Sequence, residues 1–215
     1  MPLTVAIVDY GLGNLLSVRR MLEYCGATVS LVSTPEGILS ADRLVLPGVG
    51  AFAAGMEELS RRGLVQAIRD YSRSGKHLLG ICLGMQLFLE AGEENGRHAG
   101  LNLLPGIVVR IPERTPGGQP VKIPHIGWAP IAPAPSGTSW SSGILRTVNA
   151  GDFVYFVHSY QALPHNAAQR TALVHCHDMA LTAAIEVDNL HGCQFHPEKS
   201  GPVGVRIINE FLKLS

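Results

Sequence analysis

Charged side chains are scarce in this sequence of 215 residues, and those present leave no net charge. They make up 16% of the chain, and 17 basic residues balance 17 acidic ones, so the sequence pI is near 7.1. A protein that binds nucleic acid or anionic lipid normally carries a basic excess. We therefore expect neither nucleic acid nor a membrane as a partner.

The sequence also has few cysteines and no long apolar runs. No two of the four cysteines form a CxxC pair, and four are too few for a disulfide scaffold, so we expect reduced thiols. No uninterrupted apolar stretch approaches the ~20 residues of a membrane helix, and no basic region precedes the apolar run near the N-terminus. These features predict a cytoplasmic protein.

Patterns that would indicate a metal or a dinucleotide are incomplete. The sequence His-Cys-His at 175–177 and the spacing of Cys193 and His196 superficially resemble zinc ligands, but Cys193 and His196 would point to opposite faces of an extended strand. Gly11 and Gly13 follow an apolar run, but Leu16 stands where a dinucleotide fingerprint needs its third glycine. From these patterns we predict neither a metal site nor a dinucleotide site.

Apolar residues make up 46% of the chain, enough for one substantial core, and we predict a single domain over residues 1–215. Apolar, β-branched runs at 3–8, 28–32 and 43–46 alternate with helical periodicity at 15–24 and 56–71, which a glycine at position 63 interrupts. This alternation is typical of a three-layer α/β fold, in which helices flank an open, mostly parallel sheet. Sites in such folds form beyond the carboxyl ends of the strands.

The second half of the chain is predicted to be rich in β-structure. Short strand-like runs occur at 107–111, 121–126, 153–157, 171–175, 181–187 and 193–195, and an amphipathic helix is expected at 203–214. Residues 129–143 are dense in Pro, Ala, Ser and Gly and are interpreted as a surface loop.

A cysteine form of the Gly-x-nucleophile-x-Gly elbow lies within residues 76–90. Cys82 stands between Gly80 and Gly84, where an apolar strand leads into a predicted helix. A residue at such a turn has a strained backbone. Its thiol would face the first amides of the helix, whose partial positive charge favours the thiolate form. Cys82 is the best candidate nucleophile.

The sequence His196-Pro-Glu198 supplies the two groups that such a nucleophile needs. A base must later protonate the leaving group, and a third group must orient that base. Proline disfavours helical geometry at the residue before it, so His196 should be extended. Residues two apart then point to the same side, and Glu198 can orient the His196 ring.

These two motifs, Gly-Ile-Cys-Leu-Gly-Met-Gln at 80–86 and Gln-Phe-His-Pro-Glu-Lys-Ser at 194–200, resemble those of class I (triad) glutamine amidotransferases. Four further segments are similar to the glutaminase subunits of imidazole glycerol phosphate synthases, and the match runs nearly end to end. They lie at 9–15, 46–52, 124–128 and 155–160. The family has a flavodoxin-like architecture, which agrees with the α/β pattern.

The resemblance implies a glutaminase that forms a glutamyl thioester on Cys82. It hydrolyses the thioester and passes ammonia to a cyclase subunit of (β/α)₈ form, which makes imidazole glycerol phosphate and aminoimidazole carboxamide ribotide for histidine and purine synthesis. No cofactor or metal is implied. By position, the glutamine contacts would be Gln86, Glu94, His158, Ser159 and Tyr160, the oxyanion donors Leu83, Val49 and Gly50, and the partner interface Asn14, His125 and Trp128.

Two details of the chain bear on coupling to the partner. Gly48 and Gly50 surround Val49 at a strand end, which suggests that a peptide here turns over and completes the oxyanion hole only when the cyclase holds its substrate. Ala129 follows Trp128 where the family most often has asparagine, so the docking contacts there are expected to differ.

Other interpretations remain open at this level. A paralogous glutaminase that serves amidation of a cell-surface sugar has the same build, a cysteine peptidase also attacks an amide with a Cys-His pair, and a silent interaction subunit would have lost a triad member. Gln86 and Glu94 could be ordinary exposed residues, His158 a buried structural histidine, and Asn14 a turn residue.

Overall fold

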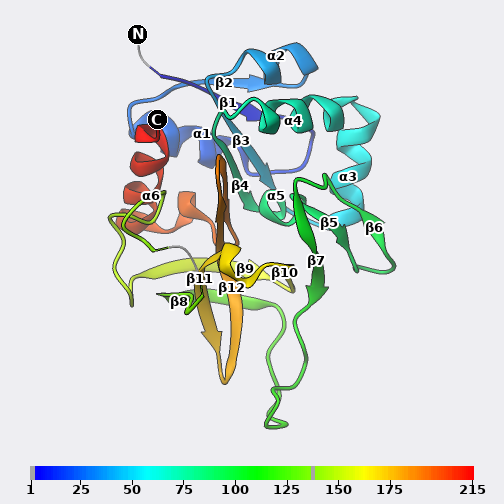
Figure 1. Ribbon diagram of the computed structural model, residues 1–215, viewed down its shortest axis with the longest axis vertical. Helices are drawn as coiled ribbons and strands as arrows, with labels where there is room; N and C mark the ends of the chain where they lie inside the picture. The colour runs from blue at the N-terminus through cyan, green and yellow to red at the C-terminus, as the bar shows by residue number, and fades with distance from the viewer. Residues whose placement is uncertain (1–2, 137–138) are drawn as a thin grey trace.

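A nine-stranded sheet forms the centre of the molecule (Figure 1). The computed structural model describes residues 3–136 and 139–215. One side of the sheet is parallel and has the strand order β2-β1-β3-β4-β13, with bounds Thr28–Val32, Thr4–Val8, Arg43–Gly48, Leu78–Cys82 and Leu190–Cys193. This is the flavodoxin-like order 2-1-3-4-5. The predicted α/β architecture is confirmed.

The β-rich second half extends this sheet with antiparallel strands. In sheet order they are β12 (Met179–Val187), β11 (Arg170–Cys176), β8 (His125–Pro133) and β9 (Phe153–His158). A second sheet has four strands in the order β10 (Tyr160–Pro164), β7 (Leu104–Arg110), β5 (Leu89–Gly92) and β6 (His98–Ala99). The sequence indicated β7 but not its three neighbours, which are short.

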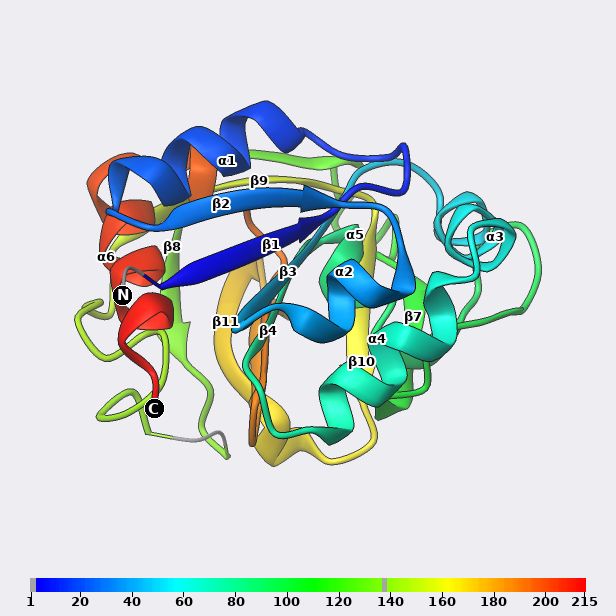
Figure 2. The same cartoon turned by 90° about the horizontal axis from the view of Figure 1, so that it is seen from above.

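Helices cover both faces of the parallel strands (Figure 2). One face carries α1 (Leu15–Tyr24) and α6 (Gly201–Lys213), and the other carries α2 (Pro35–Ser40), α3 (Phe52–Arg61), α4 (Leu64–Arg73) and α5 (Leu83–Gln86). Because side chains alternate along a strand, Val5 and Ile7 of β1 enter one core while Ala6 and Val8 enter the other. Short 3₁₀ turns, η1 (Ala167–Gln169) and η2 (Pro197–Lys199), complete the elements.

Local sequence signals explain several element boundaries. Gly63 has a φ of 69° and separates α3 from α4, as predicted. The helix α2 was not predicted, although its signals are present. Thr34 precedes it and accepts a hydrogen bond from the Gly37 N–H at 3.3 Å, and Pro35 occupies the first turn.

The surface loop expected at 129–143 is wrong in its first part, because residues 129–133 belong to β8. The strand also begins at His125 rather than at Val121. Its residues 125–130 pair with β9 and its residues 131–133 with β11, so most of the strand has only one partner. A strand paired on one side tolerates proline, which cannot donate to a second neighbour. Residues 137–138 of the expected loop lie outside the described residues.

No helix within residues 3–136 and 139–215 combines the length and the apolar character needed to cross a membrane.

Candidate active site

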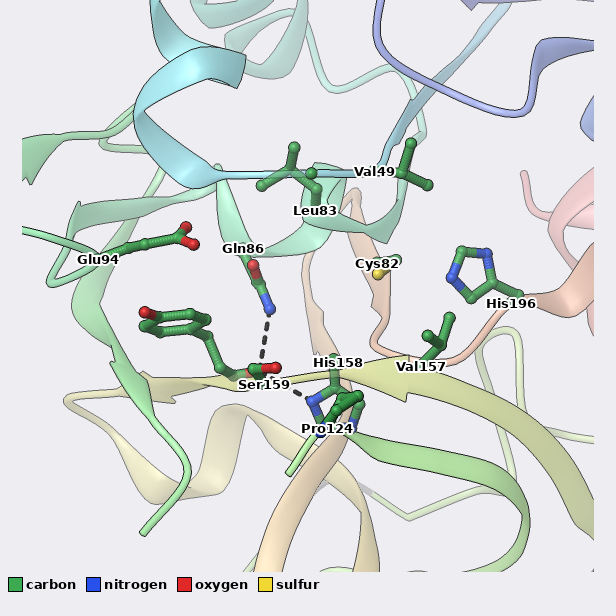
Figure 3. Close-up of a pocket in the computed structure, with 12 residues that line it drawn as sticks. Val49, Cys82, Leu83, Gln86, Glu94, Pro124, Val157, His158, Ser159 and His196 are labelled. Carbon is green, nitrogen blue, oxygen red and sulfur yellow. Dashed lines mark hydrogen bonds between the residues drawn. The ribbon is translucent and has the colours of Figure 1, made fainter. Parts of the chain in front are cut away.

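A cavity of about 450 Å³ opens where β3 and β4 end and where β9 passes into β10 (Figure 3). The residues that line it come from both halves of the chain. They are Val49, Gly50, Cys82, Leu83, Gln86, Glu94, Pro124, Val157, His158, Ser159, Tyr160 and His196. The cavity therefore brings together the candidate nucleophile, the candidate base and every residue predicted to contact glutamine or the oxyanion.

Cys82 sits on a strained turn at the end of β4. Its φ is 54° and its ψ is −108°, which costs a non-glycine residue on the order of 1–3 kcal/mol. The turn packs closely against β3, because a Cβ at Gly84 would lie 1.8 Å from the Leu46 carbonyl oxygen. A Cβ at Gly80 would lie 2.6 Å from Phe88 Cζ. The elbow predicted from the sequence thus depends on both glycines.

The helix expected after Cys82 is a single turn. The turn, α5, has four residues, and the chain enters β5 at Leu89. The partial charge at a helix end grows with the number of aligned peptide units, so α5 contributes less at Cys82 than the sequence suggested.

His196 and Glu198 form a buried pair beside the cavity. The Nδ1 atom of His196 lies 2.8 Å from Glu198 Oε1, and the side chains are 3% and 2% exposed. The backbone at His196 is extended, as predicted, but Glu198 lies in the 3₁₀ turn η2 rather than in an extended segment. The expected contact is therefore present, although a tight turn makes it.

The second ring nitrogen of His196 faces Cys82 (Figure 3). It has no hydrogen-bond partner among the described residues. Burial by itself lowers the pKa of His196, but the charge of Cys82 and the hydrogen bond and charge of Glu198 outweigh this effect and raise the pKa to about 9. At neutral pH we expect the ring to hold a proton that it can deliver to a leaving group.

His158 has the opposite electrostatic environment. Burial lowers its pKa to about 4, and the charges of His125 and His196 act in the same direction, against the hydrogen bond with the Tyr160 carbonyl oxygen. That bond measures 2.8 Å at Nδ1. Since the ring is neutral and a carbonyl only accepts, Nδ1 carries the proton. The Nε2 atom, unpartnered among the described residues, is then an acceptor.

The chain matches the family model "Glutamine amidotransferase class-I" over residues 6–214. It is 51% identical to imidazole glycerol phosphate synthase subunit HisH 1 of Legionella pneumophila (strain Paris), over 98% of this chain and 99% of the relative. It is 45% identical to subunit HisH of Streptococcus sanguinis (strain SK36), over 95% and 93% of the two chains. The chain belongs to the class-I glutamine amidotransferase family.

The fold agrees with this membership. The structure of PurLQS from Thermotoga maritima superimposes with a TM-score of 0.74 at 16% identity, and the match covers 99% of both chains. At this identity, the similarity concerns the fold alone.

The residues with predicted roles in an amidotransferase occupy different environments. Glu94 lines the cavity, and its Oε2 atom also accepts a 2.7 Å hydrogen bond from the Phe52 N–H, where it caps the start of α3. Leu83 is buried at the first position of α5, whose N–H lacks an acceptor within the helix. Val49 is 41% exposed, and Gly50 has a φ of 99°.

The three residues predicted at the partner interface differ in their exposure and in their contacts. Asn14 accepts a 3.4 Å hydrogen bond from the Ser17 N–H and so caps α1. His125 is half-buried, with its ring 5.4 Å from that of His158 and 5.2 Å from that of Phe156, and it therefore supports the wall of the cavity. Of the three, only Trp128 is largely exposed, at 53%.

Gln194 is a residue of the site that the sequence reasoning missed. It is fully buried, and its Nε2 atom donates to Cys82 Sγ at 3.7 Å. A signal for it was available, because Gln194 lies two residues before His196, and in an extended segment both side chains point to the same side.

Within residues 3–136 and 139–215, no group of three or more His, Cys, Asp or Glu is arranged to hold a metal ion.

Proposed function

We propose that this chain hydrolyses glutamine to glutamate and ammonia, as the glutaminase subunit of an imidazole glycerol phosphate synthase in histidine biosynthesis. The observation that carries the chemistry is the 2.8 Å pair of His196 and Glu198, whose free ring nitrogen faces a cysteine on a strained turn. The relatives named above carry the assignment to the synthase.

The proposed reaction has two halves. Cys82 Sγ attacks the amide carbon of glutamine, the C–N bond breaks, and His196 gives its proton to the departing ammonia. A water molecule then attacks the carbon of the glutamyl thioester and His196 takes the water proton. The C–S bond breaks, which releases the product acid and returns Cys82 as a thiolate beside the protonated His196. Glu198 holds the ring in the orientation that both transfers need.

The residues around Cys82 have supporting roles in this proposal. The Leu83 N–H and an N–H of the Val49 and Gly50 segment would stabilise the oxyanion of each tetrahedral intermediate. Glutamine would be held by the five lining residues Gln86, Glu94, His158, Ser159 and Tyr160.

An exposed apolar stripe on β8 and β9 is the proposed contact with the cyclase subunit. Ile126, Trp128 and Phe153 are each 53% exposed and lie on the paired strands β8 and β9, and the cavity is lined by His158 at the end of β9 and by Pro124, just before β8. Exposed aromatic and aliphatic residues in a cluster are typical of protein interfaces. Ammonia released at Cys82 would pass to the cyclase at this end of the molecule.

The relatives named above are synthase subunits, so the paralogue that serves sugar amidation is not favoured. The candidate base, its carboxylate and the nucleophile are all present, and no observation favours a silent subunit or a peptidase.

Replacing Cys82 with alanine tests the proposal in the reconstituted synthase. The glutamine-dependent rate should fall by about 10⁴-fold or more, because the nucleophile is lost. Synthesis from ammonium salt should persist, since it bypasses the glutaminase. The variant Cys176→Ala, half-buried and outside the cavity, is the control that should keep both activities. Glutamine-dependent synthesis by Cys82→Ala would refute the assignment.

A further inference from the structure

Gln194 is placed beside the nucleophile by the register of two parallel strands. Cys193 pairs with Ile81 across β13 and β4, so the next residues along the two strands are Gln194 and Cys82. The Gln194 N–H donates to the Ala183 carbonyl oxygen at 2.9 Å, which holds its backbone against β12. Its side chain, with no exposed surface, fills the space next to the sulfur.

Hydrogen bonding fixes which end of the Gln194 carboxamide faces the sulfur. The Tyr160 carbonyl oxygen can only accept, so the atom of Gln86 that lies 3.0 Å from it is the amide nitrogen. The same nitrogen lies 3.0 Å from Gln194 Oε1 and donates its second hydrogen there. Gln194 therefore presents its own NH₂ group to Cys82 Sγ, at 3.7 Å.

Gln86, in the cavity wall, thus donates to Gln194, and Gln194 donates to the sulfur of Cys82. His158 Nδ1 also donates to the Tyr160 carbonyl oxygen, which fixes the far end of this series of hydrogen bonds. Because both hydrogens of the Gln86 amide are used inside the protein, only its oxygen remains for a substrate in the cavity. Gln86 can then accept from a substrate N–H group but cannot donate to a substrate oxygen.

We propose that Gln194 is a further catalytic residue, whose NH₂ group hydrogen-bonds and stabilises the Cys82 thiolate, and that Gln86 is the positioning residue that orients it. A donor on the anionic form of a buried group favours that form, and Cys82 is only 7% exposed, so water supplies little solvation there. The inference rests on the proposed function, because it assumes that Cys82 reacts as a thiolate.

The test is the pH profile of Cys82 alkylation by iodoacetamide, followed by mass spectrometry in the full chain bound to its cyclase subunit. In Gln194→Met, which keeps the length of the side chain but lacks the donor, the midpoint should rise by about one pH unit. Alkylation near neutral pH should then be about tenfold slower. In Gln194→Glu, which adds a negative charge beside the sulfur, the midpoint should rise further.

Gln161→Met is the matched control. Gln161 is also a buried glutamine, at 8% exposure, but it does not line the cavity, and its replacement should leave the profile unchanged. An unchanged midpoint in Gln194→Met would overturn the proposal while leaving Cys82 as the nucleophile. Failure of the proposed function would instead appear as glutamine-dependent synthesis by Cys82→Ala.

If the variants do not fold, NMR of the unaltered protein tests the same hydrogen bond between Gln194 and Cys82. With glutamine side chains labelled with ¹⁵N, the NH₂ signal of Gln194 should shift across the same pH range in which alkylation accelerates. It should also shift once Cys82 is alkylated. A Gln194 signal that stays constant through both changes would overturn the proposal.

Discussion

His158 and His196 are both buried in the same cavity wall, yet their pKa values move in opposite directions. Nδ1 of His158 faces a carbonyl oxygen, and burial brings its pKa to about 4. Nδ1 of His196 faces the Glu198 carboxylate, and with Cys82 this raises its pKa to about 9. A full negative charge outweighs burial, whereas a carbonyl dipole does not. One residue type thus serves as a neutral acceptor at one position and as a proton donor at the other.

Replacing Glu198 with glutamine should move the alkaline limb of the glutaminase pH profile. The protonated ring exists below the pKa of His196, and losing the carboxylate lowers that pKa. We therefore expect kcat/KM for glutamine to decline at a lower pH than in the native protein, where the decline should lie near pH 9. The maximal rate should fall by about 10²–10⁴-fold.

The profile is measured from pH 6 to pH 10. Glu113→Gln is the control, because Glu113 is exposed and pairs only with Arg110, at 2.9 Å, among the described residues. An alkaline limb that stays in place in Glu198→Gln would show that Glu198 does not set the proton affinity of His196.

At the scale of elements, β3 and β4 build the elbow and the candidate oxyanion segment together. Gly48 pairs with Cys82, and a Cβ at Gly48 would lie 2.3 Å from the Tyr10 hydroxyl oxygen. That hydroxyl donates to the Pro47 carbonyl oxygen at 2.8 Å. Gly48 is therefore held in place, whereas no atom lies within 4 Å of a Cβ at Gly50. Of the two glycines expected to allow a peptide to turn over, Gly48 is enclosed, and Gly50, which has a positive φ, is open on the side where a Cβ would lie.

This arrangement predicts that the glutaminase is slow until the cyclase holds its ligand. If the peptide between Val49 and Gly50 supplies an oxyanion donor only in the liganded complex, the rate should rise by about 10²–10³-fold on ligand binding, which is the effect of one donor. Steady-state hydrolysis of glutamine is compared for the subunit alone, the complex, and the complex with cyclase ligand. Equal rates in all three would exclude the switch.

At the scale of the whole molecule, buried and partly buried polar residues also occupy the opposite end of the sheet. His77 Nδ1 lies 3.0 Å from His191 Nε2, and His191 Nδ1 lies 2.9 Å from Glu186 Oε1. Arg43 donates to the carbonyl oxygens of Leu212 and Leu214. The Arg43 contacts hold the end of α6 against the start of β3, away from the cavity.

We expect the folded chain to lose stability in acid, because several of its histidines are shielded from water. Burial lowers the pKa values of His77, His125 and His158, so these side chains bind protons more weakly in the folded chain than in the unfolded chain. The free energy of unfolding should then fall as the pH drops below about 6.5, the ordinary histidine value. His196, whose pKa is raised, is protonated in both states at that pH and adds no further change.

His158 alone should account for about 2 kcal/mol of this loss between pH 7 and pH 4.5. Urea unfolding across this range should therefore show a smaller loss in His158→Gln. His165→Gln, at a histidine that is 63% exposed, should behave as the native chain. The same loss in His158→Gln as in the native chain would contradict the prediction.

Much of the local structure was readable from the sequence because its causes are local. The bounds of α1 and β2 were as predicted, since apolar periodicity and a following glycine define them. The elbow around Cys82 and the contact of His196 with Glu198 follow from backbone constraints on a few consecutive residues. The shortness of α5 could not be read, because residues 83–90 carry an apolar pattern that suits both a helix and a strand.

The sequence by itself determined the alternation of strands and helices in the first half, the elbow, and the histidine with its carboxylate, because each of these depends on neighbours along the chain. Only the tertiary structure decided that Gln194, which lies 112 residues after Cys82, donates to its sulfur, and that His125 supports the cavity wall. Which strands become neighbours, and in which register, is set by packing of the whole sheet. A contact between side chains on two different strands therefore cannot be predicted from a local sequence pattern.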